Sequence, residues 1–395
     1  MALILFALFV SVPFFCCLAA LLPWLLWLPG APRLPPSSTR SSSQRSRSSS
    51  PSRLSETQYR NGPLKRAKIY IDEESPTDIV DYAINRAFHS LHDNDDSPLP
   101  ASEKLWSKSK ELVRNSSGEA EWTQALYAVI DDIRPTGLKV VINRDWNEDV
   151  KPPVNNPLPM IPHKRNQPGQ LLPETLREGT PDPAVPAIPL FKLKNPRPDI
   201  CIGLSDDSLA RALEDLGVPQ FFLQDLQLAS TLISDPHTTP LELRFPFLIV
   251  EAKSGATGGN LYQAQNQAAV SGASALQILQ SLADLQAAQR LDEGSRNSNP
   301  NPTESAPGLP RAPPPPNIVF SITMEGPIHE LWLHFQKPRE KTFSMVCLGS
   351  WRTTLRDSSR DLVRHLRAVL RWGSGEFREG IINTLRAYNE MLTSA

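Results

Sequence analysis

Proline is the feature that most constrains this chain, because 39 of its 395 residues are proline. Proline lacks a backbone N–H and has a fixed φ, so it ends helices and is excluded from the interior of sheets. The prolines concentrate near the N-terminus, between about 150 and 198, and between about 291 and 316. Regular structure is therefore expected between these stretches. The length alone suggests two or three domains. Because of these proline-rich stretches, we expect one folded core with long interruptions instead.

The first 29 residues carry no charge and are mostly Leu, Phe, Val, Ile, Ala, Trp and Cys. An apolar stretch of about 20 residues can span a bilayer, and the basic start of a signal peptide is missing here. The segment predicts a membrane anchor or an uncleaved signal. The alternative is a mis-predicted first exon that is absent from the real protein.

Residues 30–70 form a basic tail rich in Ser, Arg and Pro, in which ten of the 16 residues from 37 to 52 are serine. Such a stretch cannot bury apolar surface, so disorder is expected. Its end, residues 63–68, resembles a nuclear-import cluster, or is a solvated linker, or flanks a membrane segment on its cytoplasmic side. The predicted location is therefore the membrane if residues 1–29 are real, and otherwise the nucleus or the cytoplasm.

Residues 71–103 are acidic and contain a predicted accessory helix outside the main core, capped by Ser75 with Pro76 at its first position. The whole chain has a formal net charge of −1, which excludes polyanion binding through bulk charge but not through a local patch. Its four cysteines are too few and too scattered for a disulfide scaffold or a zinc module.

The remaining sequence alternates between apolar runs and amphipathic segments, as expected for a mixed α/β (α+β) domain. Apolar periodicity predicts helices over 119–130, 261–290 and 376–391, and a helix that begins at a Ser358 cap. It predicts strands over 198–204, 244–253 and 342–348, and a hairpin over 317–336 that turns at Gly326 and Pro327. The stretch 205–240 reads as largely helical.

Polar residues at the ends of two predicted strands carry the chemistry. Glu251 and Lys253 are two residues apart, so they share one face of their strand. An acid and a lysine that directly follow a fully apolar run are costly to bury unless they are paired or coordinated. If the strand that begins at Asp199 is a neighbour, two carboxylates and a lysine converge at one edge. Carboxylate oxygens suit Mg²⁺, and a metal with a lysine suits attack on a phosphodiester.

These residues resemble the PD-(D/E)XK nuclease superfamily, and more closely the fungal PD-(D/E)XK nuclease-like domain family. The resemblance covers roughly residues 104–391, and four segments carry it in order: 119–122 (EAEW), 197–200 (RPDI), 247–254 (FLIVEAKS) and 266–273 (NQAAVSGA). One departure is the separation of 52 residues between Asp199 and Glu251, which is longer than a hairpin needs.

The resemblance implies a restriction-endonuclease-like αβββαβ core and a site that binds Mg²⁺ or Mn²⁺. Asp199 and Glu251 would be metal ligands, with the backbone carbonyl of Ala252 as a further ligand. Lys253 would be the catalytic lysine. Gln267 on the following helix would assist in catalysis. An acid on the first helix would complete the metal site, and Glu119 is the first choice for it, with Glu121 as the alternative. These two acids lie about 200° apart on a helix, so only one of them can face the site.

The predicted domain covers residues 104–393, with insertions at about 150–189, 205–243 and 291–316. Its predicted function is metal-dependent hydrolysis of nucleic acid, with DNA preferred to RNA as the partner. The alternative is a catalytically inactive domain of the same fold that binds DNA or protein and is membrane-tethered if residues 1–29 are real. The sequence makes no prediction of oligomeric state.

Overall fold

A computed structural model describes residues 54–73, 77–88, 100–156, 191–296, 316–337 and 340–394. The chain divides into two compact units, residues 1–52 and 53–395, and the described residues all belong to the second. The predicted membrane segment at 1–29, the serine-rich tail at 37–52, the cap at Ser75 and most of the proline-rich insertions lie outside the described residues.

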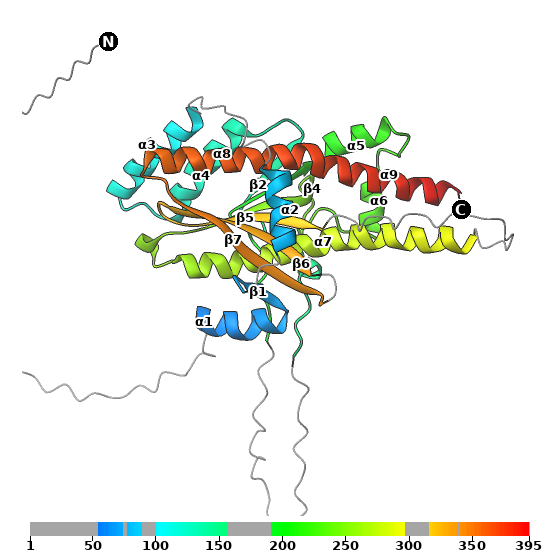
Figure 1. The fold of residues 1–395 in the computed structure, drawn as a ribbon, viewed down its shortest axis with the longest axis horizontal. Coiled ribbons are helices and arrows are strands. Elements are labelled where there is room, and N and C mark those ends of the chain that lie inside the picture. Colours follow the sequence, from blue (N-terminus) through cyan, green and yellow to red (C-terminus); the bar gives the residue numbers. More distant parts are fainter. Residues whose placement is uncertain are drawn as a thin grey trace, which may run out of the picture. The chain divides into compact units, whose positions relative to one another are not determined.

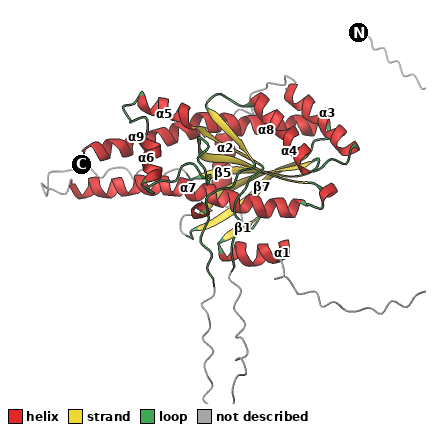
Figure 2. Cartoon of the chain, turned by 180° about the vertical axis from the view of Figure 1, so that it is seen from behind, coloured by secondary structure: helices red, strands yellow, loops and turns green. Residues whose placement is uncertain are grey.

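A seven-stranded mixed sheet forms the centre of the second unit, in the order β1-β7-β6-β5-β4-β3-β2 (Figures 1 and 2). Neighbouring strands are parallel in β1–β7 and β4–β5 and antiparallel in the other pairs. The bounds are β1 Ile69–Ile71, β2 Leu138–Ile142, β3 Ile200–Ser205, β4 Leu243–Lys253, β5 Ile318–Glu325, β6 Ile328–Lys337 and β7 Thr342–Arg352.

Helices cover both faces of this sheet. The long helix α7 packs on one face, where Ser271 and Gly272 contact Glu251 and His334. On the other face Phe320 packs against Trp372 of α8. The α-helices are α1 Glu56–Tyr59, α2 Thr77–Ala87, α3 Pro100–Arg114, α4 Glu119–Ile133, α5 Asp206–Glu214, α6 Phe222–Leu228, α7 Leu261–Arg296, α8 Arg356–Trp372 and α9 Arg378–Ser394.

The elements α4, β2, β3, β4, α7 and β5 follow one another as helix, three strands, helix and strand, which is the predicted αβββαβ order. All eleven residues of β4 are buried, because the strand lies inside the sheet and is covered on both faces. The segment between β3 and β4 contains α5, of nine residues, and α6, of seven residues, so the stretch 205–240 is less helical than predicted. The fold class is therefore mixed α/β, as predicted.

The prediction of a disordered tail up to residue 70 is wrong from residue 54 onward. The structure places α1, a π-helical turn over Arg60–Leu64, and β1 in this stretch. Tyr59, Leu64, Ala67 and Ile69 belong to the hydrophobic core, so the segment does bury apolar surface. Within the basic cluster at 63–68, Lys65 and Lys68 are exposed, whereas Pro63, Leu64 and Ala67 are buried.

Two predictions about helices also need correction. The helix α2 is not outside the core, because Ala83, Ala87 and Phe88 are buried in it and Phe88 packs edge-on against Phe320. Ser358 does not cap α8. That helix begins at Arg356, and the Ser358 hydroxyl instead accepts a hydrogen bond from the backbone N–H of Arg352.

Besides the elements before residue 72, the helix α3 and the strand β2 were also not predicted. No helix within the described residues is both long and apolar enough to cross a membrane.

Candidate functional site

The candidate site lies at the sheet edge where β4 ends and β3 begins. The β3–β4 ladder pairs Ile200 with Val250, so Asp199 lies just beyond the last paired residue of β3. There the Asp199 carboxylate accepts a hydrogen bond from the backbone N–H of Ala252, with a distance of 2.7 Å between Oδ2 and N. The carboxylate thereby takes the place of a strand partner for this N–H group and is fixed beside the end of β4.

The Lys253 ammonium occupies the middle of this edge. Its Nζ atom lies 3.1 Å from Oε1 of Glu119 and 4.0 Å from Oδ2 of Asp199, and it also donates to the backbone carbonyl of Ala252. The Lys253 side chain is only 8% exposed. A largely buried cation therefore lies among three oxygen groups from three separate parts of the chain.

Glu251 is the most deeply buried acid of the site, with 2% of its surface exposed. Its Oε1 atom accepts a hydrogen bond of 3.0 Å from the Ser271 hydroxyl of α7. Burial raises the pKa of Glu251 well above its usual value, and the Asp199 charge raises it further. Burial also raises the pKa of Asp199, against the opposing effects of the Ala252 N–H and of Lys253. Both carboxyl groups therefore hold protons more strongly than in water.

The geometry distinguishes the two acids on α4. Glu119, the first residue of α4, forms the contact with Lys253. Glu121 instead turns back toward Gly118, where its Oε2 atom would lie 3.2 Å from an added Cβ. The start of α4 is held against the loop after β4 by a hydrogen bond of 2.9 Å from the Ser254 hydroxyl to the Ser117 carbonyl.

A small cavity of about 40 Å³ lies beside Glu251 and contains the predicted glutamine. The side-chain oxygen of Gln267 is buried and has no hydrogen-bond partner. A cavity of this volume has room for about one water molecule, so an ordered water or ion could satisfy that oxygen. The cavity is lined by Tyr59, Lys194, Asn195, Pro196, Arg197, Glu251, Asn266, Gln267, Val270 and Ser271.

The oxygen donors of the site suit a hard cation with few protein ligands. Within the described part of the chain, no three or more His, Cys, Asp or Glu side chains are grouped so that they could hold a metal ion. Asp199 and Glu251 are two carboxylates, and the Ala252 carbonyl is a third oxygen group nearby. Mg²⁺ commonly uses one or two protein carboxylates and takes its other ligands from water and substrate phosphate. The donor set therefore fits Mg²⁺ or Mn²⁺ better than a metal that needs a complete protein cage.

Two residues of the site were missed in the sequence. Ser271 lies four residues after Gln267, so helical spacing alone places both on one side of α7. Tyr59 comes from α1, and its hydroxyl accepts a hydrogen bond of 2.9 Å from the backbone N–H of Lys194. No signal near the predicted motif pointed to Tyr59, because it lies in a stretch that was expected to be disordered.

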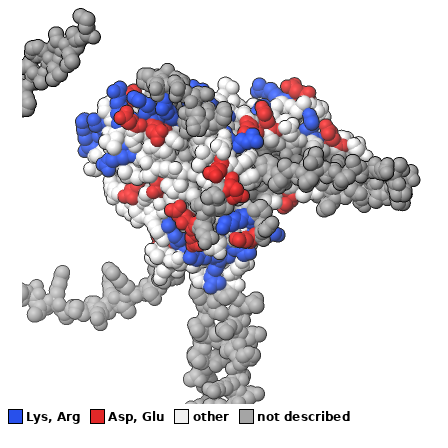
Figure 3. Space-filling model, viewed as in Figure 1, with Lys and Arg blue, Asp and Glu red and all other residues white. Residues whose placement is uncertain are grey.

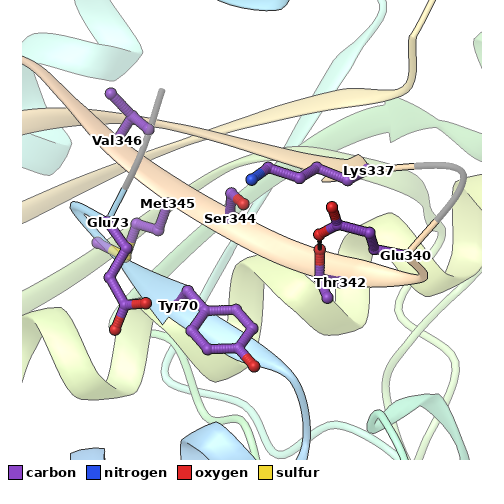
Figure 4. A pocket seen from close by; sticks show the side chains of 8 residues that line it. All are labelled: Tyr70, Glu73, Lys337, Glu340, Thr342, Ser344, Met345 and Val346. Atoms are coloured by element: carbon purple, nitrogen blue, oxygen red, sulfur yellow. Dashed lines mark hydrogen bonds between the residues drawn. The ribbon is translucent and has the colours of Figure 1, made fainter. Parts of the chain in front are cut away.

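A second hollow, of about 240 Å³, lies at the opposite sheet edge, where β6 ends and β7 begins (Figure 4). The Thr342 hydroxyl donates a hydrogen bond to Glu340 at its rim. It is lined by Tyr70, Glu73, Lys337, Glu340, Thr342, Ser344, Met345 and Val346. This hollow shares no residue with the site around Glu251, so it is a separate feature of the surface.

A family model described as a domain of unknown function (DUF7924) matches residues 157–385. The matched part contains Asp199, Glu251, Lys253 and Gln267, whereas Glu119 and α4 precede it. No curated protein matches the chain. No solved structure matches it either.

Proposed function

Since the chain belongs to this family of unknown function (DUF7924), we propose from the site's geometry that it is a metal-dependent nuclease of the PD-(D/E)XK type. The proposed reaction is hydrolysis of a phosphodiester bond in nucleic acid. The observation that carries the proposal is the contact of Lys253 with Glu119, Asp199 and the Ala252 carbonyl beside the buried Glu251.

Asp199, Glu251 and the carbonyl of Ala252 would hold Mg²⁺ or Mn²⁺. When bound, the ion would supply positive charge that stabilises the phosphate in the transition state and favours deprotonation of water. The fit is supported by the oxygen-only donor set and by the unpartnered Gln267 oxygen in the adjoining cavity.

Lys253 is the proposed catalytic lysine. Its ammonium can donate hydrogen bonds to a phosphate oxygen or orient the attacking water, while Glu119 holds it in place through the 3.1 Å contact. In the reaction the water oxygen forms a bond to phosphorus and the bond from phosphorus to the leaving sugar oxygen breaks. One proton of the water is lost, and the leaving oxygen gains a proton. Gln267 assists from the cavity by binding water or a phosphate oxygen.

The direct test is a cleavage assay of the full chain on DNA and RNA with Mg²⁺ or Mn²⁺. Lys253→Ala and Glu251→Gln should each lower the rate at least about a hundredfold, the usual size of losses at positioned catalytic groups. Lys341→Ala is the control, since it removes an exposed lysine near the start of β7. Absence of cleavage on any nucleic acid, or cleavage that both site variants retain, would exclude the proposal.

A binding module with the same fold is the second candidate. It is favoured by the Lys253 ammonium, which already occupies the space among Asp199, Glu119 and Ala252. A protein of this kind would bind nucleic acid with equal affinity in Mg²⁺ and in EDTA and would leave it intact. Binding without cleavage, unaffected by Lys253→Ala, would favour this candidate over the nuclease.

A further inference from the structure

Five arginines form a continuous stripe along α8: Arg356, Arg360, Arg364, Arg367 and Arg371. At 100° per residue their spacing confines them to an arc of about 80°, and the stripe is about 22 Å long. The opposite side of the helix supplies the core residues Leu362, Leu366 and Val369. We call this stripe the arginine ridge.

The arginine ridge starts close to the candidate site. Since β7 is parallel to β5 and β4, it ends at the same sheet edge as Lys253, and α8 begins just after it. Hydrogen bonds connect the two places: the Thr353 N–H donates to the Pro327 carbonyl, and the Gly326 N–H donates to the Lys253 carbonyl. The ridge therefore leads away from the edge at which a phosphodiester would be cleaved.

Three arginines of the ridge reach solvent, and two of these form ion pairs at the surface. The Arg356 side chain is 58% exposed and pairs with Glu103, and Arg371 is also exposed. Arg360 is 33% exposed, and a carboxylate oxygen of Asp357 lies 3.9 Å from its guanidinium. Exposed ion pairs of this kind contribute less than about 1 kcal/mol, so a phosphate can compete with them. Arg364 and Arg367 are half-buried and have partners of their own.

The basic surface continues from the ridge onto α3, which packs against α8. Arg356 and Lys110 both lie over the ring of Trp106, whose indole N–H donates to the Thr354 carbonyl. Figure 3 shows Lys and Arg gathered at the upper left, over α3 and the neighbouring end of α8. Acidic side chains also lie in this area, and two of them, Glu103 and Asp357, pair with Arg356 and Arg360.

We infer that the arginine ridge binds the phosphate backbone of a nucleic-acid duplex that extends from the candidate site. Arginine suits this role because its planar guanidinium donates two parallel hydrogen bonds to a phosphate. Contacts of this kind fix the position of a nucleic acid without reading its sequence. The inference rests on the proposed function, since that function supplies the reason for a duplex at this edge.

The test measures binding and not cleavage. The full chain carrying Lys253→Ala is titrated with a labelled 30-base-pair duplex in EDTA, and fluorescence anisotropy is followed from about 50 to 200 mM NaCl. The ridge variant adds Arg356→Gln, Arg360→Gln and Arg371→Gln. The control variant adds Lys65→Gln, Lys139→Gln and Arg386→Gln, which removes the same charge elsewhere from side chains that are 39–47% exposed.

The ridge variant should bind at least about tenfold more weakly near 0.1 M salt, because each phosphate contact contributes about 0.9 to the slope of log K against log salt. That slope should become shallower by about two to three, whereas the control variant should change it far less. Thermal unfolding checks that both variants fold. If the triple variant does not fold, Arg371→Gln and Arg371→Glu take its place, and each should still reduce the slope.

Equal losses in the ridge and control variants would overturn the inference, because total charge would then explain the binding. It would also be overturned if the chain binds vesicles that contain phosphatidylserine and does not bind the duplex. The cleavage assay of the unsubstituted chain keeps the two proposals apart. If the ridge variant lowers the salt slope and the unsubstituted chain cleaves no nucleic acid, the ridge inference stands and the nuclease proposal fails. If the chain cleaves nucleic acid and the ridge variant leaves the salt slope unchanged, the nuclease proposal stands and the ridge inference fails.

Discussion

At the residue scale, the position of the Lys253 side chain depends on Gly259. A Cβ atom added at Gly259 would lie 3.0 Å from Cδ and 3.1 Å from Cβ of Lys253. Gly259→Ala should therefore push the lysine stem away from Glu119 and Asp199. A displacement of about 1 Å at a reacting group can cost up to about a hundredfold in rate, so kcat for cleavage should fall about tenfold or more while KM changes little.

Gly255→Ala is the matched control for this substitution, because it lies in the same loop. An added Cβ there would meet only Oε1 of Glu325, at 3.6 Å, which is an ordinary contact. Steady-state cleavage kinetics of the two variants are compared, and circular dichroism checks their folding. Equal kcat values for the two variants would show that Gly259 does not position Lys253.

The buried Glu251 should make the protein less stable as the pH rises. Its pKa is raised in the folded state by burial, so the folded protein holds this proton after the unfolded chain has lost it. The contribution to stability is fully present below the unfolded pKa, near 4.5, and is lost as the pH rises through the higher folded value. Glu251→Gln is neutral at every pH and escapes this loss.

Glu251→Gln should therefore raise the thermal unfolding midpoint at pH 8 in EDTA and leave it nearly unchanged at pH 4.5. Added Mg²⁺ should stabilise the unsubstituted chain at pH 8 by up to about 3 kcal/mol at a hundredfold excess over Kd. It should not stabilise the variant. Glu379→Gln, an exposed position on α9, is the control. If Glu251→Gln lowers the midpoint at both pH values, the buried charge is not the destabilising group.

The local sequence pattern was sufficient to predict some residues of the candidate site. The apolar run before Glu251 and the alternation of strand side chains identified Glu251 and Lys253 as neighbours on one face. The pairing of Asp199 with Ala252 required knowledge that β3 and β4 are adjacent, and only the resemblance supplied that. Pattern could not choose between Glu119 and Glu121, because the choice depends on how the start of α4 lies against the loop after β4.

At the element scale, the contact between α7 and the sheet depends on a glycine in the middle of the helix. A Cβ added at Gly272 would lie less than 3 Å from three ring atoms of His334, and the His334 ring is fixed by its hydrogen bond to the Ser321 hydroxyl. Gly272→Ala should destabilise the protein by about 1–3 kcal/mol, the usual cost of overpacking. This cost exceeds the gain of up to about 1 kcal/mol in helix propensity.

Gly380→Ala, in another helix, should have the opposite effect on stability. Gly380 lies in α9, and an added Cβ there would meet no atom within 4 Å. The substitution should stabilise the protein by about 0.5–1 kcal/mol through helix propensity alone. Urea unfolding of both variants gives the two free energies. Stabilisation by Gly272→Ala would mean that α7 does not approach the sheet this closely.

Among the elements, pattern predicted the strands that contain long apolar runs, but it missed the short strand β2 and the highly charged helix α3. Buried β4 and the hairpin of β5 and β6 were predicted from their apolar runs. The five residues of β2 contain Leu138, Val140, Val141 and Ile142, so their β-branched character could have revealed this strand. The helix α3 carries many charges, and its buried residues are small or widely spaced. The sequence pattern around Ser358 fits a cap, but a tertiary hydrogen bond to Arg352 takes up that hydroxyl.

At the scale of the whole described unit, the N-terminal segment completes both the sheet and the site. The strand β1 adds to the outer edge of β7, and α1 packs on α7 beside the cavity. Arg60, which follows α1, holds this segment against α7. Its guanidinium lies 3.5 Å from the centre of the Tyr262 ring and donates a hydrogen bond of 2.7 Å to Asn266. A chain that begins after β1 therefore lacks part of the core and one wall of the cavity.

A chain that starts at residue 72 should be less stable than one that starts at residue 53. The shorter chain loses Tyr59, Leu64 and Ile69 from the core and exposes the backbone edge of β7. Its free energy of unfolding in urea should be lower by roughly 2–5 kcal/mol, the range for removing a large buried side chain. Since Tyr59 no longer covers the cavity, water reaches Glu251 and its pKa should move back toward the usual value. Equal urea midpoints for the two chains would show that the N-terminal segment is not part of the folded unit.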